Sequence, residues 1–147
     1  MTVSEFIEKH EGRRKKPYKC PAGKMTVGVG YNFDDNPLPP HIAQYLKKHG
    51  QITDAMIDDL LQCSISIAED DCHDLFPDFD NFTENRKMAL TDFVFQLGKT
   101  KASRFVNSIA MINTGRWEEA AANMLKSTWA QQVKKRAAEV TDLIEAG

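Results

Sequence analysis

Apolar and polar positions follow a helical period at the start of the chain and change their spacing soon afterwards. The apolar stripe of the first helix consists of Val3, Phe6, Ile7 and His10. Gly12 follows where a left-handed cap would end that helix. Residues 25–31 (MTVGVGY) are β-branched and glycine-spaced, and residues 21–23 (PAG) before them are typical of a turn. Residues 12–31 therefore predict a small antiparallel hairpin or a three-stranded sheet.

The middle of the chain returns to the helical period. Residues 32–40 (NFDDNPLPP) have the composition of a loop, and residues 41–48 favour a short helix that Gly50 ends. Thr53 is a good N-cap for a long helix that extends to about Leu75. The positions expected to share one face of that helix are Met56, Ile57, Leu60, Leu61, Ser64, Ile67 and Ala68.

The rest of the chain, after Pro77, predicts helices separated by short breaks. Four segments are expected, and they run from Thr83 to Gly98, from Ser103 to Gly115, from Arg116 to Lys126 and from Ser127 to Glu145. Three aromatic residues at helical spacing are expected in the core, namely Phe93, Trp117 and Trp129.

The order of these elements predicts an α+β fold, mainly α, in a single domain. A small β-containing lobe of about residues 1–52 would be joined by a helix over about 53–75 to an all-α lobe of about 76–147. A chain of 147 residues is long enough to bury a hydrophobic core. A cleft between the two lobes is the expected place for a ligand.

Composition narrows the class of protein without identifying it. Hydrophobic residues make up 41% and charged residues 27%, and no apolar run approaches the roughly 20 residues of a membrane span. The N-terminal residues MTVSEFIEKH carry charges every few positions, so we expect no secretory leader. Cys63 and Cys72 are expected on one helix, too far apart for a disulfide. A reduced, cytosolic start is the simplest interpretation.

Positive and negative side chains are segregated, although the net charge is only −2. Residues 51–85 contain ten acidic residues and no Lys or Arg, whereas residues 99–136 contain eight basic residues and two acidic ones. A second basic run, residues 13–16 (RRKK), follows the first helix. Such asymmetry can attract an anionic polymer, although a solvated helix face is the simpler interpretation of any single run.

Three residues with side chains that could take part in catalysis lie close together in the sequence near the N-terminus. Glu11 lies at the carboxyl end of the first helix and at the edge of its apolar stripe, where exposed carbonyls and partial burial disfavour a second negative charge. A carboxyl group that keeps its proton can serve as a general acid. Position alone leaves an ordinary surface glutamate as the alternative. Cys20 and Thr26 follow after eight and five intervening residues.

Other groupings of chemically active side chains have weaker spacing. The histidines and remaining cysteines lack the paired spacing of zinc ligands, so we predict no metal site and no cofactor. These residues are His41, His49, His73, Cys63 and Cys72. A papain-like pair of Cys20 with His10 or His41 lacks a nucleophile motif around the cysteine. The aromatic residues do not interleave with a basic stripe, which argues against nucleic-acid binding.

An ordered series of short motifs runs along nearly the whole chain. The first is the E-x8-C-x5-T arrangement of Glu11, Cys20 and Thr26, with YK before the cysteine and TVGVG around the threonine. Further segments are residues 93–98 (FVFQLG), 105–108 (FVNS), 115–121 (GRWEEAA) and 127–129 (STW), with Arg136 seven positions after Trp129. This series, from near residue 3 to about 137, resembles the phage-type lysozymes, glycoside hydrolase family 24.

The resemblance implies a lysozyme-like fold and hydrolysis of the β-1,4 bond between N-acetylmuramic acid and N-acetylglucosamine in bacterial peptidoglycan. Glu11 would be the general acid, Cys20 would occupy a position that is commonly Asp and sometimes Cys in the family, and Thr26 would orient the attacking water. An inverting mechanism is implied. The substrate-binding residues that the resemblance implies are Tyr31, Phe95, Gln96, Phe105 and Arg136. Arg136 would approach Glu11 across the cleft.

Cys20 is where the chain departs from the commonest pattern of the family. A thiol with an ordinary pKa of about 8.5 is mostly neutral at pH 7 and stabilises a developing positive charge poorly. Lys19 and the RRKK run would lower that pKa and give a partly thiolate group. Three interpretations stay open: a substitute base, a spectator beside Glu11 and Thr26, or the mark of a slow or inactive relative. An exposed Cys20 would also be sensitive to oxidation.

The resemblance also implies a biological setting. A phage or prophage endolysin without a leader would accumulate in the host cytoplasm and reach the wall in the periplasm only after a holin breaches the membrane. We expect a monomer that binds peptidoglycan, whose stem-peptide carboxylates suit the basic runs, and neither nucleic acid nor stable membrane insertion. Two alternatives stay open: a catalytically weak or silent wall-binding relative, such as a tail-associated module, and a non-lytic helical interaction domain.

Overall fold

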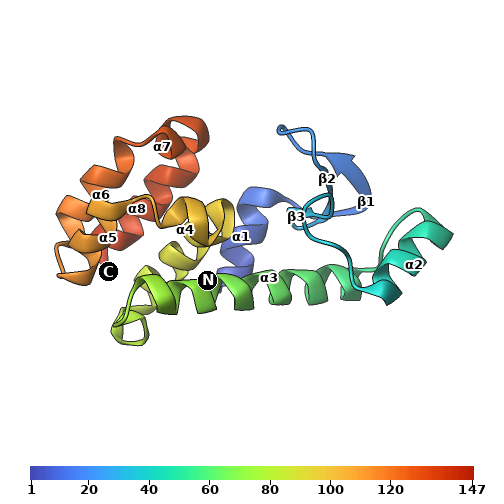
Figure 1. Ribbon diagram of the computed structural model, residues 1–147, viewed down its shortest axis with the longest axis horizontal. Coiled ribbons are helices and arrows are strands. Elements are labelled where there is room, and N and C mark those ends of the chain that lie inside the picture. The colour runs from blue at the N-terminus through green and yellow to red at the C-terminus, as the bar shows by residue number, and fades with distance from the viewer. The chain divides into compact units, whose positions relative to one another are not determined.

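The computed structural model describes residues 1–147 and contains eight α-helices, one 3₁₀ helix and a three-stranded antiparallel sheet (Figure 1). This content confirms the predicted α+β class. The chain forms two compact units, an N-terminal unit of Ser4–Ser64 and a C-terminal unit of Ile65–Gly147 together with Met1–Val3. Helix α3 (Asp54–Leu75) contributes to both units. None of the helices combines the length and the apolar character needed to cross a bilayer.

The N-terminal unit carries the sheet and two helices in addition to the first half of α3. Its elements are α1 (Val3–Glu11), β1 (Arg14–Lys19), β2 (Met25–Gly28), β3 (Tyr31–Asn32) and α2 (Pro40–His49). β2 is the central strand, and its Thr26 is paired with Tyr18 of β1 and with Asn32 of β3. The predicted turn at residues 21–23 joins β1 to β2. The three-stranded alternative is therefore the correct one.

The strand signal over residues 25–31 is divided in the structure between β2 and β3. Gly28 and Gly30 have φ angles of +67° and +65°, in the left-handed region that residues with side chains rarely adopt. The chain reverses between these glycines, and Val29 between them is 4% exposed. The side chain of Ile57 on α3 packs against Gly28, where an added Cβ would lie 3.3 Å from it.

Helix ends in this unit follow the predicted capping residues. The N–H of Gly12 donates to the Glu8 carbonyl at 2.8 Å and ends α1 just after Glu11. Gly50 is the left-handed C-cap of α2. Thr53 Oγ1 accepts the N–H of Met56 at 3.1 Å at the start of α3.

One face of α3 is buried along its length, and one predicted member of that face is wrong. The buried residues are Ile57, Leu60, Leu61, Ile65, Ala68 and Cys72. Ile67 is instead 63% exposed, and Ile65 is buried in its place. Ile65 and Ile67 are two residues apart, which corresponds to a rotation of about 200° around the helix axis, so they cannot share a face. Cys63 and Cys72 both lie on α3, as predicted, and because Cys63 is exposed while Cys72 is buried, the two thiols lie on opposite sides of that helix.

Five helices and the second half of α3 make up most of the C-terminal unit. They are α4 (Glu84–Ala102), α5 (Val106–Asn113), α6 (Trp117–Leu125), α7 (Thr128–Val133) and α8 (Lys135–Ala146), preceded by a 3₁₀ helix over Phe79–Asn81. α8 packs against α4, α6 and α7, and α5 packs against α6 (Figure 1). The consecutive residues Ala89–Val94 of α4 are all buried, so this helix is enclosed by its neighbours.

Helix boundaries in the C-terminal unit differ from the prediction at two places. The segment from Ser127 to Glu145 is interrupted at Lys134, whose φ of +32° and ψ of −88° separate α7 from α8. Neither Gly nor Pro marks this break in the sequence, and α8 beyond it packs against α4 and α6. The helix expected from Ser103 begins at Val106. Gly98 has non-helical angles, a φ of +76° and a ψ of 162°, so the regular helix breaks at the residue where the sequence predicted its end.

The predicted aromatic core is confirmed for two of its three members. Phe93 is 2% exposed and Trp129 is 5% exposed. Trp117 is only half-buried, because it lies at the start of α6 beneath the guanidinium of Arg86, whose central carbon is 4.0 Å from the ring centroid. The stacked cation covers a ring face that core side chains would otherwise cover.

Candidate active site

Glu11 is held at the junction between the first helix and the sheet of the N-terminal unit. It is the last residue of α1, and its side chain is half-buried. A Cβ atom built on Gly30 would lie 2.7 Å from Glu11 Oε1 and 3.1 Å from its Cδ. The carboxylate therefore rests directly against the backbone of the turn between β2 and β3, and only glycine leaves room for it there.

The sheet brings polar side chains next to one another beside Glu11. Tyr18 and Thr26 are cross-strand partners in β1 and β2. Burial raises the pKa of the Tyr18 phenol, and the negative charge of Glu11 raises it further, so the phenol lies within electrostatic reach of the carboxylate. Thr26 is 3% exposed, and its hydroxyl donates to the Lys24 carbonyl at 3.0 Å.

Cys20 is a free, half-buried thiol at the end of β1. Its pKa is lowered chiefly by a backbone hydrogen bond from Lys24; burial opposes this effect, while the backbone of Ala22 and the hydroxyl of Thr26 add to it. The direction agrees with the prediction, but the cause does not. Hydrogen bonds of the turn favour the thiolate, rather than the positive charges of Lys19 and the RRKK run.

Much of the basic run at residues 13–16 is engaged inside the N-terminal unit. Arg13 and Lys15 form ion pairs with acidic residues of α1 and α3. The guanidinium of Arg14 lies over the ring of Tyr18, with its central carbon 4.4 Å from the ring centroid. The run therefore attracts an anionic polymer less than its sequence suggests.

Tyr31 follows Gly30 directly, but its hydroxyl points to the loop after β3. This hydroxyl donates to the Pro37 carbonyl at 3.1 Å. Burial of the ring raises the pKa of Tyr31, with a further contribution from Cys63 on α3. The structure thus gives Tyr31 a task in holding the loop, and its binding to substrate stays a prediction.

A pocket of about 740 Å³ opens in the C-terminal unit among α4, α5, α6 and α7. Phe105 and Trp129 line it, and each of their ring centroids lies 4.9 Å from that of Phe93 beneath them. Ser108 and Asn123 add polar groups, joined by a hydrogen bond of 2.7 Å from Asn123 Nδ2 to Ser108 Oγ. No carboxylate lines the pocket, whose basic residues are Lys101, Arg104 and Lys126.

A chain of hydrogen bonds runs from the wall of this pocket into the C-terminal unit. Trp129 Nε1 donates to Gln96 Oε1 at 3.1 Å, and Gln96 Nε2 donates to Asp92 Oδ2 at 2.9 Å. Arg136 donates to both carboxylate oxygens of Asp92. Asp92 is fully buried and Arg136 is 9% exposed, so the guanidinium compensates a carboxylate that has lost its water. We call Trp129, Gln96, Asp92 and Arg136 the Asp92 network.

The sequence profile of the family described as phage lysozyme matches residues 8–143 of this chain. The match covers all of the N-terminal site and nearly all of the C-terminal unit. The chain belongs to the phage lysozyme family.

Relatives of this chain come from Dictyostelium discoideum and from a bacteriophage. Probable T4-type lysozyme 2 of Dictyostelium discoideum is 30% identical over 161 residues, which cover 99% of this chain and 95% of that protein. Probable T4-type lysozyme 1 of the same organism is 27% identical with the same coverage. The pre-baseplate central spike protein Gp5 of Enterobacteria phage T4 is 27% identical over all of this chain, which spans 28% of that protein. These relationships support a lysozyme-type glycosidase.

The predicted site residues of this lysozyme divide between its two units. In the N-terminal unit Cys20 contacts Thr26, and Tyr18, the cross-strand partner of Thr26, lies within electrostatic reach of Glu11. In the C-terminal unit, Phe105 lines the pocket, whereas Gln96 and Arg136 belong to the Asp92 network. Phe95 is half-buried on α4 and is not among the residues that line the pocket.

Four residues that support the predicted site residues were not themselves predicted from the sequence. Gly30 and Tyr18 contact or face Glu11, and Trp129 and Asp92 hold Gln96 in place. A signal existed for Tyr18, which lies two positions before Cys20 on a predicted strand and therefore on the same face. A lone aspartate within an apolar helical segment likewise indicates a buried carboxylate with a polar partner, and Asp92 is such a residue.

Proposed function

We propose that this phage lysozyme is a muramidase that hydrolyses the β-1,4 bond between N-acetylmuramic acid and N-acetylglucosamine in peptidoglycan, with Glu11 as the general acid. One observation carries the proposal: a half-buried glutamate rests against Gly30 in the same unit that holds Cys20 and Thr26 in contact with each other, in a chain of this family. A fixed carboxyl group next to a second group that can accept a proton is what glycoside hydrolysis requires.

In the proposed reaction Glu11 donates its proton to the glycosidic oxygen as the bond from that oxygen to the anomeric carbon breaks. Thr26 has a single hydroxyl proton, which is shared between the Lys24 carbonyl and the Cys20 sulfur, so its oxygen lone pairs can accept a hydrogen bond from the attacking water. The thiolate of Cys20 takes the proton that this water loses. Attack from the face opposite the leaving group inverts the anomeric configuration.

We assign saccharide binding in the C-terminal unit to the pocket that Phe105 and Trp129 line. The aromatic rings suit the apolar faces of sugar rings, and Ser108 and Asn123 supply neutral hydrogen-bonding groups. The Asp92 network fixes the indole of Trp129 from behind. Phe95, Gln96 and Arg136 support this unit's binding surface, and Tyr31 belongs to substrate binding in the N-terminal unit.

The biological role that we propose is that of a phage or prophage endolysin working as a single-domain monomer. It would be made in the host cytoplasm, would reach the periplasmic wall after a holin opens the membrane, and would bind peptidoglycan without inserting into a membrane or binding nucleic acid. The substitution of Cys for the family's common Asp favours a second candidate, a wall-binding relative with little or no turnover.

Digestion of purified Gram-negative sacculi tests the proposal and separates the two candidates. A muramidase releases soluble muropeptides with new reducing ends at N-acetylmuramic acid, which borohydride reduction and mass spectrometry identify. A silent relative sediments with the sacculi and releases none. New reducing ends at N-acetylglucosamine, or release of free peptides, would show a different bond specificity and would overturn the proposal.

The role of Cys20 predicts a difference between two substitutions. Cys20→Asp is expected to keep activity and Cys20→Ser to lose about 100-fold, because the serine hydroxyl cannot ionise and accept the water's proton. Because the thiol must lose its proton to act, wild-type activity should rise as pH passes upward through the lowered Cys20 pKa. In Cys20→Asp this rise should move to lower pH, since the ordinary pKa of Asp is about 3.9.

Profiles of kcat/KM against pH for wild type and both variants measure this effect. Cys63→Ser is the matched control, because it replaces an exposed thiol that takes no part in the proposed proton transfers and should leave the pH profile of kcat/KM unchanged. A Cys20→Ser variant as active as wild type would show that Cys20 is a spectator and that Glu11 and Thr26 carry the reaction.

A further inference from the structure

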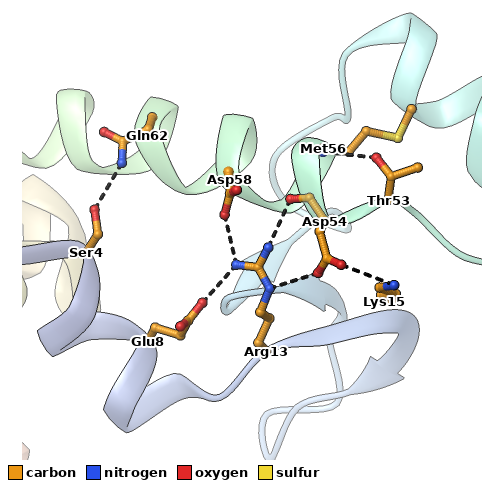
Figure 2. Close-up of polar contacts among 9 residues, drawn as sticks. All are labelled: Ser4, Glu8, Arg13, Lys15, Thr53, Asp54, Met56, Asp58 and Gln62. Carbon is orange, nitrogen blue, oxygen red and sulfur yellow. Dashed lines mark hydrogen bonds and ion pairs between the residues drawn. The ribbon is translucent and has the colours of Figure 1, made fainter.

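Arg13 lies two residues after Glu11 and is bound by acidic groups from two helices (Figure 2). Its Nη1 donates to Glu8 Oε1 at 2.8 Å and to Asp58 Oδ1 at 2.9 Å. Its Nε donates to Asp54 Oδ1 at 3.1 Å, and its Nη2 donates to the Asp54 carbonyl oxygen at 3.0 Å. We call Arg13, Glu8, Asp54 and Asp58 the Arg13 cluster.

The Arg13 cluster is the last step of a series of polar contacts between α1 and α3. At the start of α1, Gln62 Nε2 donates to Ser4 Oγ at 3.0 Å (Figure 2). One turn further along α1, Glu8 meets Asp58 through the guanidinium, and Arg13 then reaches Asp54. The partners on α3 follow one another at one helical turn, from Gln62 to Asp58 to Asp54, while those on the other side run the opposite way from Ser4 and Glu8 of α1 to Arg13 just beyond its end, so the contacts fix α1 lengthwise against α3.

Helix α3 also supports the turn on which the Glu11 carboxylate rests. Ile57 lies between Asp54 and Asp58 in sequence and packs against Gly28, two residues before Gly30. One stretch of α3 thus holds the end of α1 through Arg13 and the β2–β3 turn through Ile57. The contact of Glu11 with Gly30 depends on both attachments, because a shift of α1 along α3 would carry the carboxylate off the turn.

We propose that Arg13 is a positioning residue for Glu11. Arg13 holds the carboxyl end of α1 at the position along α3 where the Glu11 carboxylate contacts Gly30. This inference rests on the proposed role of Glu11 as general acid. The planar guanidinium suits the task, because it offers fixed donors to three side chains and a carbonyl at once, whereas a lysine ammonium cannot reproduce that fork. Its side chain is 28% exposed, so water competes only partly for these contacts.

A competing explanation treats Arg13 as part of a basic surface that attracts the anionic wall. Charge substitutions separate the two explanations, because one explanation predicts weaker catalysis and the other predicts tighter substrate binding. Removing the negative charge of Asp58 by Asp58→Asn should lower kcat if the Arg13 cluster positions Glu11. The same change should favour an anionic substrate, and lower KM at low salt, if only surface charge matters.

Steady-state kinetics on soluble glycan strands is the first measurement. Arg13→Gln is expected to lower kcat about 10-fold to 100-fold with KM within about twofold, because small displacements of a catalytic group have effects of this size. Arg13→Lys should recover part of the loss. Lys16→Gln is the matched control, since it removes one exposed positive charge from the same run and should leave kcat unchanged.

The Glu11 side-chain carboxyl carbon and the Gly30 amide provide an NMR readout that needs no turnover. Both signals should move in Arg13→Gln and Asp58→Asn and stay in place in Lys16→Gln. Wild-type kcat together with unmoved signals in Arg13→Gln would overturn the inference, as would a loss in Lys16→Gln equal to that in Arg13→Gln. If wild type itself releases no reducing ends, the proposed function fails, and the NMR signals alone decide whether Arg13 positions Glu11.

Discussion

Glu11→Gln is expected to lower the release of reducing ends from sacculi about 1,000-fold, within the range by which general acids accelerate proton transfer. The amide keeps the size and shape of the carboxyl group and can rest against Gly30 in the same way. It has no proton to donate to the departing glycosidic oxygen. The loss should therefore appear in kcat, while the fraction of protein that sediments with sacculi stays at the wild-type value.

Glu118→Gln is the control for this experiment, because it makes the same chemical change at an exposed position of α6. It should digest sacculi at the wild-type rate. Equal digestion by wild type and Glu11→Gln would remove Glu11 from the reaction and with it the assignment of the N-terminal site.

Gly30→Ala is expected to lower kcat about 100-fold through displacement of the Glu11 carboxylate. The new methyl group would lie 2.7 Å from Glu11 Oε1, and the far end of a flexible side chain is the part that gives way. The φ of +65° at residue 30 lowers the free energy of unfolding of the variant by a further amount of about 1 kcal/mol. Most of the protein stays folded after a loss of this size. Loss of activity should thus greatly exceed loss of folded protein.

Gly50→Ala separates the two effects of that substitution. Residue 50 has a similar φ of +71°, but an added Cβ there meets nothing within 4 Å. It should show the same fall in thermal stability as Gly30→Ala and keep its kcat. Circular dichroism melts and kinetics on the same samples make the comparison. A kcat for Gly30→Ala no lower than for Gly50→Ala would mean that the carboxylate does not need its contact with residue 30.

The sequence by itself determined the features of this protein that depend on neighbouring residues. Thr53 predicted the start of α3, because an N-cap hydroxyl bonds a backbone N–H three residues away. Gly12 predicted the end of α1 and so the terminal position of Glu11. Strands around Cys20 and Thr26 followed from β-branched residues and turn signals within twenty positions of one another, although the sequence left a hairpin and a three-stranded sheet as alternatives.

Only the tertiary structure decided the features that depend on residues distant in the sequence. It exposed Ile67 and broke the last helix at Lys134, because packing against other helices overrode local preference there. It showed that backbone hydrogen bonds, and not the predicted charges of Lys19 and the RRKK run, are the main cause of the lowered Cys20 pKa. It also joined Arg13 to Asp58 across 45 residues. Hydrophobic period and capping residues report nothing about contacts of this kind, since their energy comes from partners that the fold brings together.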